Sequence, residues 1–522
     1  MGRLFFMDKK MKRFSSADAA LNKIFGYEAF RDMQREAIDA LVEGKDCLVL
    51  MPTGGGKSLC YQIPALLRDG IAVVISPLIS LMQDQVQALQ QKGVRAVYIN
   101  SLLSKKEVWD IHYAIKRGRV DMIYIAPRRL LTEKMFSYLK GQTISLFAID
   151  EAHCVSAWGN DFRPEYGALN VLKKYFPEVP RIALTATADT LTRKEIKRKL
   201  LDHPKRFIGS FDRENIFYQV VVKECVERQL TQFILQNHAG QSGIVYALSR
   251  KTCESIAKYL QEQGIRAMAY HAGLDASTRT ARQSSFLESS DVVMVATIAF
   301  GMGIDKPNVR FVAHVDMPKS IENYYQETGR AGRDGKVAHA WLAYSGTDVN
   351  NQRFLIKQMP QDQVFYDQSL FKLEQMYAFC ETPDCLRQRL LSYFGEEIRH
   401  CEYCPYCCSS VIKEDVTTRA IWALQCIDAG HFLFSKHHTL KIVNRVLRGA
   451  QSERIYLYQL DKNPYYGIGK MCSEKKWGKI LRRLLDLKAI DCNWEKDGLL
   501  EVSERLGQAI LSGECVVEIR KK

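Results

Sequence analysis

Short hydrophobic runs recur along the chain, each separated from the next by an amphipathic stretch of helix length. The first series comprises residues 47–50, 71–76, 96–99, 121–126, 146–150 and 181–185. Continuous runs rich in β-branched residues are typical of strands buried on both faces of a parallel sheet. Their alternation with helices predicts an α/β lobe with helices on both faces of the sheet.

The same alternation restarts after a loop-like stretch at 202–216. The second series comprises residues 243–248, 267–270, 291–297, 309–315 and 338–344. We therefore predict two α/β lobes in tandem, each with a parallel sheet.

From about residue 350 the alternation stops, and the chain becomes helical around a cysteine cluster at 380–408. A polar joint at 409–415 precedes a last unit, in which we expect a helix at 477–490 followed by a strand, a turn and a strand up to residue 503. Helices followed by a short hairpin resemble a winged helix. The predicted domains are residues 1–209, 210–348, 349–412 and 413–522.

Charge and cysteine content narrow the class of protein. The 522 residues carry 74 Lys and Arg against 59 Asp and Glu, a net charge of +15. This excess favours a polyanionic partner such as nucleic acid, although a solvated basic surface is the alternative. No hydrophobic run of membrane-spanning length is present, so we expect no transmembrane helix. The N-terminus is too short and too charged for a signal peptide. Without such a signal, the 15 cysteines fit a reducing cytoplasm, as thiols or metal ligands.

The segment DCLVLMPTGGGKS at 46–58 follows a predicted strand and precedes a helix. In a phosphate-binding loop, glycines aim backbone N–H groups at phosphate oxygens, a lysine contacts the β- and γ-phosphates, and a hydroxyl binds Mg²⁺. Met51 occupies the place of the first glycine, which serves the turn and not the phosphate contact. A glycine-rich turn beside a surface lysine is the alternative. The candidate nucleotide-binding residues here are Thr53, Gly54, Gly55, Gly56, Lys57 and Ser58.

Two further segments carry charge suited to phosphate chemistry. In SLFAIDEAH at 145–153, Asp150 can hold Mg²⁺ and Glu151 can orient the attacking water. In QETGRAGRDG at 326–335, Arg330 and Arg333 lie three residues apart, as suits two cations facing a γ-phosphate. The alternatives are a solvated acidic pair and a basic, glycine-punctuated turn.

These segments, with TAT at 185–187, occur in the order found in superfamily 2 helicases. The stretches at 25–34, 77–85, 150–166 and 300–312, and the cysteines near residue 400, resemble the RecQ family of ATP-dependent DNA helicases over about residues 20–510. The chain resembles a short form without the extra C-terminal helical domain. The resemblance implies two RecA-like P-loop NTPase lobes, a helical zinc-binding subdomain and a winged-helix domain. It also implies ATP and Mg²⁺ as cofactors and 3′–5′ unwinding in DNA repair and recombination.

The resemblance assigns roles to individual nucleotide-site residues. It places adenine recognition at Tyr27, Arg31 and Gln34, a nucleotide neighbour at Asp305, γ-phosphate sensing at Gln326 and Arg330, and the arginine finger at Arg333.

The resemblance also implies an aromatic-rich loop that senses single-stranded DNA. Arg128 stands where the family usually has glutamate, and Asn160 stands where it usually has histidine, which puts the efficiency of DNA coupling in question. The DNA-sensing residues are His153, Trp158, Phe162 and Arg163.

The cysteines near residue 400 have the spacing C-x15-C-x2-C-x2-C. C-x2-C pairs let two thiolates bind one ion, and four sulfurs with no open position indicate a structural Zn²⁺ site. Cys380 and Cys408 are alternative ligands. The predicted ligands are Cys385, Cys401, Cys404 and Cys407.

The predicted partners are single-stranded and duplex DNA and a single-strand-binding protein, with no membrane and a cytoplasmic, nucleoid-associated location. For the last unit we expect phosphate contacts from a helix around Trp477 and a duplex-splitting role for Trp494 at the hairpin. That helix carries Lys475, Lys476, Lys479, Arg482 and Arg483. Two rivals remain: an RNA helicase or non-unwinding translocase, and a DNA-binding module whose ATPase has decayed.

Overall fold

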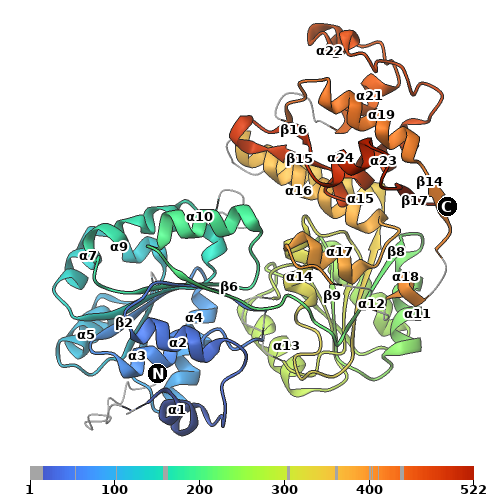
Figure 1. Cartoon of the computed structure of the whole chain (residues 1–522). Coiled ribbons are helices and arrows are strands. Elements are labelled where there is room, and N and C mark those ends of the chain that lie inside the picture. The colour runs from blue at the N-terminus through green and yellow to red at the C-terminus, as the bar shows by residue number, and fades with distance from the viewer. Residues whose placement is uncertain are drawn as a thin grey trace. The chain divides into compact units, whose positions relative to one another are not determined.

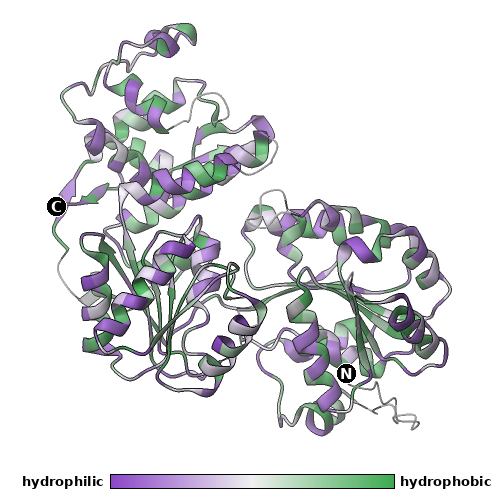
Figure 2. Cartoon of the chain, turned by 180° about the vertical axis from the view of Figure 1, so that it is seen from behind, coloured by the Kyte–Doolittle hydropathy of each residue, from purple (hydrophilic) through white to green (hydrophobic). Residues whose placement is uncertain are grey.

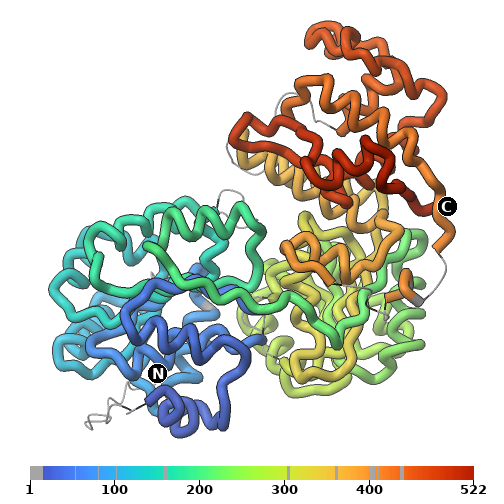
Figure 3. The backbone as a smooth tube through the Cα atoms, in the orientation of Figure 1, coloured from blue at the N-terminus to red at the C-terminus, as the bar shows by residue number. Residues whose placement is uncertain are grey.

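The chain forms two compact units, described here one at a time. The first contains residues 1–213 with 299–307, and the second contains residues 214–298 with 308–522. Figure 3 traces the backbone through both. The computed structural model describes residues 14, 16–52, 54–100, 103–156, 163–301, 306–358, 363–398, 401, 404–408, 411–434 and 440–521.

A seven-stranded parallel sheet forms the centre of the first unit, in the order β3-β4-β2-β5-β6-β1-β7. Its strands are β1 (Cys47–Leu50), β2 (Ile71–Ile75), β3 (Ala96–Ile99), β4 (Met122–Ile125), β5 (Ile144–Ile149), β6 (Arg181–Thr185) and β7 (Lys205–Ile208). Its helices are α1 (Ala17–Ala20), η1 (Leu21–Phe25), α2 (Gln34–Val42), α3 (Leu59–Leu67), α4 (Ile79–Gln91), α5 (Lys105–Lys116), α6 (Pro127–Leu130), α7 (Glu133–Lys140), η2 (Ala152–Val155), α8 (Pro164–Gly167), η3 (Ala168–Asn170), α9 (Val171–Tyr175) and α10 (Thr190–Leu200).

Six of these strands could be predicted from hydrophobic runs in the sequence because their residues are largely buried. The strands β1, β2, β4, β5 and β6 are buried along their whole length, as continuous hydrophobic runs require. Helices α2 and α3 cover one face, and α9 and α10 lie on the other (Figure 1). Hydrophobic residues gather on the strands and polar residues on the outer helix faces (Figure 2).

The prediction of a loop at 202–216 was wrong in part. Strand β7 lies within it and pairs with β1 at the edge of the sheet. Its residues are largely exposed, so it lacks the hydrophobic run that marked the other strands.

The parallel register brings distant segments to one edge of the sheet. Leu50, which ends β1, pairs with Thr185 at the end of β6, and Ile75 pairs with Ile149 before the acidic pair. The loops that follow these strands therefore lie at the carboxyl edge, where α/β sheets bind ligands.

The second unit contains a six-stranded parallel sheet in the order β10-β11-β9-β12-β13-β8. Its strands are β8 (Ile216–Val222), β9 (Gly243–Tyr246), β10 (Ala267–Tyr270), β11 (Val293–Ala296), β12 (Phe311–His314) and β13 (Ala338–Tyr344). Its helices are α11 (Val226–Asn237), α12 (Arg250–Glu262), α13 (Ala276–Glu288) and α14 (Ile321–Thr328). The prediction of two parallel α/β lobes is confirmed.

The rest of the second unit is mainly helical. It begins with α15 (Gly346–Gln358), α16 (Gln363–Glu381), α17 (Leu386–Tyr393) and α18 (Pro405–Cys408). It continues with β14 (Lys413–Asp415), α19 (Thr417–Asp428), α21 (Leu440–Leu447), α22 (Glu453–Leu457), η4 (Leu460–Lys462), α23 (Glu474–Asp486), β15 (Ile490–Asn493), η5 (Trp494–Lys496), β16 (Leu499–Val502), α24 (Leu506–Leu511) and β17 (Glu518–Arg520). Helix α23 and the antiparallel hairpin β15–β16 confirm the predicted helix, strand, turn and strand. The C-terminal strand β17 returns to pair with β14, in a stretch we had predicted to be a joint.

In the parts of the chain that the structure describes, no helix combines the length and hydrophobicity needed to cross a membrane.

Candidate nucleotide, DNA and zinc sites

The loop between β1 and α3 has the backbone of a phosphate-binding loop. Gly54 and Gly56 have φ of +86° and +76°, a region that favours glycine. A Cβ at Gly56 would lie 2.4 Å from Nε2 of Gln34, so a larger residue there would have to displace that amide as well as adopt a strained φ.

The structure shows how methionine is accommodated at position 51, where the loop pattern has its first glycine. The Met51 side chain is buried in the core between the sheet and helices α2 and α3. Its backbone N–H donates to the carbonyl of Thr185 at 3.3 Å, so position 51 continues β1 by one residue. The turn is left to the later glycines, which leaves the loop intact with methionine at this position.

Lys57 and Ser58 lie at the end of this loop. The Lys57 ammonium donates to the carbonyl oxygens of Met51 and Pro52, at 3.0 and 3.2 Å. It is therefore held beside the cradle of backbone amides, within reach of a phosphate that enters it. The Ser58 hydroxyl accepts from Nε2 of Gln85 at 3.5 Å.

Of the three predicted adenine-contacting residues, the structure places one against the phosphate loop. The Gln34 amide donates to the carbonyls of Gly55 and Gly56 at 3.2 and 3.1 Å and accepts from the backbone of Arg31 at 2.9 Å. Tyr27 and Arg31 are exposed. Thr53 and Asp305 lie outside the described residues.

The acidic pair follows β5 and meets this loop. The Asp150 N–H donates to the carbonyl of Ile75 at 2.9 Å, and Glu151 has a left-handed φ of +48°, which costs energy for a non-glycine residue. Burial and the neighbouring Glu151 raise the pKa of Asp150 to about 7, while the Lys57 ammonium opposes the rise. A buried carboxylate beside a second one fits a site for Mg²⁺, because a divalent cation offsets both the burial of the Asp150 charge and its repulsion by Glu151.

His153 joins the acidic pair to the TAT segment. Its Nδ1 lies 2.9 Å from the Thr185 hydroxyl and 3.3 Å from Oε2 of Glu151. The Thr185 hydroxyl in turn donates to the carbonyl of Thr187 at 2.9 Å. His153 is buried, so in this structure it contacts protein groups and not an exposed DNA path.

Arg163 follows the predicted DNA-sensing loop and donates to the carbonyl of Pro77 at 3.3 Å. Trp158, Asn160 and Phe162 lie outside the described residues. The Arg128 guanidinium, 84% exposed, donates to Oε1 of Glu165 on α8 at 2.9 Å, so the arginine at this position takes part in an ion pair.

Sequence reasoning missed Tyr166. This buried side chain donates to the carbonyl of Asp150 at 2.9 Å and steadies the acidic turn. The only signal was its position at the end of the stretch 150–166 that marked the resemblance.

In the second unit, Gln326 lies on α14, and Arg330 and Arg333 lie on the turn that follows it. Gly332, between the two arginines, has φ of +56°. Its carbonyl accepts from Nδ2 of Asn215 at 2.8 Å, and its N–H donates to Val309 at 2.8 Å. These bonds hold the arginine turn against the start of β8.

The four predicted zinc ligands come together. Their Sγ atoms all lie within 4.8 Å of one another, and pairs are separated by 3.2, 3.6 and 3.8 Å. Tetrahedral Zn–S bonds of about 2.3 Å imply sulfurs about 3.8 Å apart, so the cluster fits Zn²⁺. A hydrogen bond with Cys404 and burial raise the pKa of Cys385 to about 12, so a cation is needed to hold these groups as thiolates. The cluster consists of Cys385, Cys401, Cys404 and Cys407.

The structure tests one of the two alternative zinc ligands, Cys380, and does not test the other, Cys408. Cys380 is buried in α16 and does not belong to the cluster that the described residues form. The side chain of Cys408 lies outside what the structure describes.

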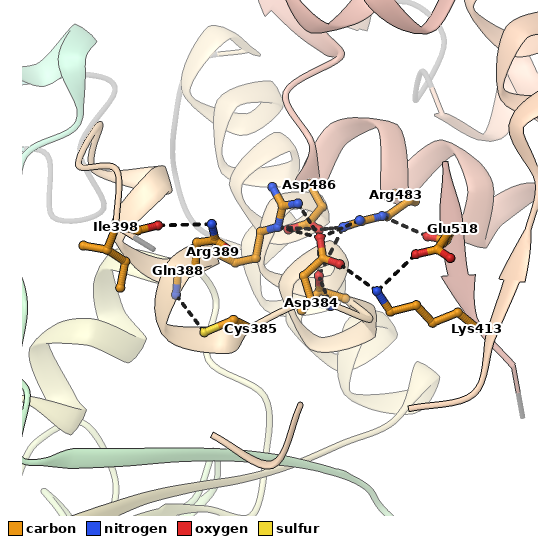
Figure 4. Close-up of polar contacts among 10 residues, drawn as sticks. Asp384, Cys385, Gln388, Arg389, Ile398, Lys413, Arg483, Asp486 and Glu518 are labelled. Atoms are coloured by element: carbon orange, nitrogen blue, oxygen red, sulfur yellow. Dashed lines mark hydrogen bonds and ion pairs between the residues drawn. The ribbon is translucent and has the colours of Figure 1, made fainter. Parts of the chain in front are cut away.

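The prediction of a phosphate-binding face on α23 was wrong for two of its five cations, and the tryptophan around which they lie is part of the core. Trp477 is fully buried, and its indole donates to the carbonyl of Gly469 at 3.0 Å. Arg482 is paired with Glu381 at 2.7 Å, and Arg483 is buried and paired with Asp384 and Asp486 (Figure 4). The helix packs against α16, so its arginines neutralise acids inside the protein.

The expected wedge at the hairpin was also wrong. The Trp494 ring packs against Phe371 of α16 and Phe434, with centroids 5.8 and 5.9 Å away. It therefore joins the hairpin to the helical part of the unit and does not project from the tip.

Comparison with protein families gives matches along almost the whole chain. The matching models are DEAD/DEAH box helicase at residues 31–196, Helicase conserved C-terminal domain at 225–335, RecQ zinc-binding at 346–408 and RQC domain at 410–522.

Two bacterial relatives match over nearly full length. The ATP-dependent DNA helicase RecQ of Haemophilus influenzae is 42% identical, covering 97% of this chain and 81% of the relative. The protein of the same name from Bacillus subtilis is 40% identical, covering 96% and 84%.

Solved structures support the fold at low sequence identity. The Mycobacterium smegmatis helicase Lhr bound to single-stranded DNA and AMP-PNP has a TM-score of 0.50 at 20% identity, covering 81% of this chain and 58% of its own. Dbp5 from S. cerevisiae, bound to RNA and ADP-BeF3, has a TM-score of 0.51 at 18% identity, covering 65% and 90%.

Proposed function

The chain belongs to the RecQ family and is an ATP-dependent DNA helicase, and we propose that it moves 3′ to 5′ along one strand while it separates the duplex. The direction is what the resemblance to the family implies, and the observation that best supports ATP hydrolysis as its energy source is local to the first unit. The phosphate loop with Lys57 and the acidic pair of Asp150 and Glu151 meet at the carboxyl edge of one parallel sheet.

In the proposed mechanism, the chain's own groups bind and polarise ATP. Backbone amides of Gly54–Ser58 and the Lys57 ammonium hold the phosphates, and Ser58 and Asp150 hold Mg²⁺. When bound, Mg²⁺ neutralises charge on the β- and γ-phosphates. Glu151 orients the attacking water, and its contact with His153 links it to Thr185.

We assign the remaining nucleotide roles to residues matched by resemblance. Gln326 and Arg330 sense the γ-phosphate, and Arg333 stabilises the charge that develops on it during transfer. We place Thr53 in the phosphate loop and Asp305 near the nucleotide, and adenine is held by Tyr27, Arg31 and Gln34. For Gln34 this requires exchanging a bond to the phosphate loop for a bond to the base, so adenine binding and loop geometry are linked.

We propose that Trp158 and Phe162, with Arg163, form the single-stranded DNA sensor. Base stacking on an aromatic ring contributes roughly 1–3 kcal/mol. Trp158→Ala should therefore abolish the stimulation of ATPase activity by single-stranded DNA without lowering thermal stability. A stable variant whose ATPase still responds fully to DNA would contradict the assignment.

The cysteine cluster holds Zn²⁺ in a structural role, since four thiolates leave no open coordination position. We further propose a role in DNA repair and recombination, contact with a single-strand-binding protein, a cytoplasmic and nucleoid-associated location, and domain boundaries near 209, 348 and 412. The domain boundaries rest on the pattern of elements along the sequence, and the other proposals rest on the family alone.

Unwinding assays test the proposal against its rivals. Duplexes with identical 3′ or 5′ single-stranded tails, in DNA and in RNA, are incubated with the chain, ATP and Mg²⁺. We expect unwinding of the 3′-tailed DNA duplex only. Unwinding from the 5′ tail would refute the polarity, and ATP hydrolysis without strand separation would favour a translocase.

A further inference from the structure

Helix α14 leads directly into the arginine turn. Gln326 lies in its last turn, and Arg330 and Arg333 follow within five residues of its end at Thr328. The position of this helix therefore sets where Gln326 points and where the arginine turn begins, and the bonds of Gly332 fix the rest of the turn.

The buried face of α14 carries an ion pair with α16. The Lys372 ammonium donates to Oε1 of Glu322, and the two residues are 8% and 5% exposed. Burial by itself would raise the pKa of Glu322, but Lys372 and a hydrogen bond from Tyr393 lower it overall. The carboxylate is thus held charged at a defined point between α14, α16 and α17.

Two aromatic contacts hold the same face. The ring of Tyr324 lies 5.6 Å from that of Phe379 on α16, and the ring of Tyr325 lies 5.0 Å from that of Phe394 at the end of α17. Helix α17 begins directly after the zinc ligand Cys385, which caps it by accepting from the N–H of Gln388 at 3.4 Å. The contacts that hold α14 therefore come from α16 and from α17, and α17 begins at a zinc ligand.

We propose that the zinc-binding subdomain positions α14 for ATP hydrolysis, with Glu322 and Lys372 as positioning residues. The inference rests on the proposed roles of Gln326, Arg330 and Arg333. Glu322 and Lys372 are not among the residues to which we assign contacts with the nucleotide. A charge that acts on the transition state is sensitive to displacement, and a shift of about 1 Å can cost about a hundredfold in rate.

The test must separate positioning from general stability. Lys372→Met alone leaves a buried carboxylate without its cation and can unfold the unit. The double variant Glu322→Gln, Lys372→Met removes both charges, keeps the side-chain volumes, and leaves no unpaired ion. The matched control combines Arg353→Met with Glu374→Gln, because this change removes both charges of another ion pair of α16 that does not involve α14.

Each variant is measured as the full chain with ATP, Mg²⁺ and saturating single-stranded DNA. We expect the double variant to lose about tenfold in kcat, with its KM for ATP, its DNA affinity and its zinc content within twofold of wild type. The control variant, Arg353→Met with Glu374→Gln, should keep its kcat within twofold.

Two outcomes would overturn the inference: full kcat in the double variant, or an equal loss in the control. Arg333→Ala is measured in parallel and tests the proposed function separately. If that variant loses turnover while the double variant keeps it, only the positioning role falls. If Arg333→Ala itself keeps full turnover, the proposed arginine role falls, and the positioning role with it.

Discussion

Asp384→Asn probes the charged cluster that ties the zinc-binding subdomain to the winged helix. The Asp384 carboxylate accepts from Arg389 at 3.1 Å and from Arg483 of α23 at 2.5 Å, and it lies 3.6 Å from the Lys413 ammonium (Figure 4). Burial opposes its charge, yet Arg483 and Arg389 outweigh burial and lower its pKa from 3.8 to about 2.

This shift gives the expected magnitude. Lowering the pKa of Asp384 from 3.8 to about 2 corresponds to roughly 2–3 kcal/mol of stabilisation of the charged carboxylate at neutral pH. Asp486 remains 2.6 Å from Arg483 and 3.6 Å from Arg389 in the variant, so neither guanidinium is left without an acid. We therefore expect a loss of about 2–3 kcal/mol, below the 3–5 kcal/mol typical of a wholly broken buried pair.

Hydrogen exchange at neutral pH is the suitable assay, because a chain of several domains does not unfold in one step. Amides in α17 and α23 should lose protection about fiftyfold, whereas those of the first unit should not change. Asp428→Asn, an exposed acid at the end of α19, is the control and should leave exchange unaltered. Unchanged protection in α23 of Asp384→Asn would refute the reasoning.

Three further predictions concern the nucleotide loop, the zinc site and a buried histidine. Lys57→Ala should abolish ATP hydrolysis while DNA binding persists, because the basic charge is spread along the chain; hydrolysis at the wild-type rate would exclude the loop assignment. Cys404→Ser should lose zinc by metal analysis and lower the melting temperature of the second unit, since metal binding and folding are coupled; a normally folded variant with full zinc would count against the site. Burial lowers the pKa of His238 from 6.5 to about 4. As the pH falls, the imidazole is therefore protonated in the unfolded chain before it is protonated in the folded chain. The free energy of unfolding should drop by about 3 kcal/mol between pH 6.5 and pH 4. His238→Phe should remove that part of the pH dependence in denaturant unfolding, and an unaltered dependence would contradict it.

Local patterns in the sequence determined much of this protein. Hydrophobic runs identified the buried strands because each run lies on one strand and needs no distant partner to be recognised. Cysteine spacing identified the zinc ligands, and the glycines around Lys57 identified the phosphate loop, because a turn and its ligands lie within a few residues of each other. The edge strand β7 was missed because an exposed strand carries no such run.

Only the tertiary structure decided which charged and aromatic side chains are exposed. Arg483 on its amphipathic helix has the pattern of a DNA-binding residue, yet its partner Asp384 lies 99 positions away. Trp494 packs on Phe371, and Lys372 pairs with Glu322, 50 positions apart. Periodicity describes one element at a time, so it cannot show which face meets another element that also carries charge. Folding brings those faces together, and the cost of burying a charge alone requires that each finds a partner there.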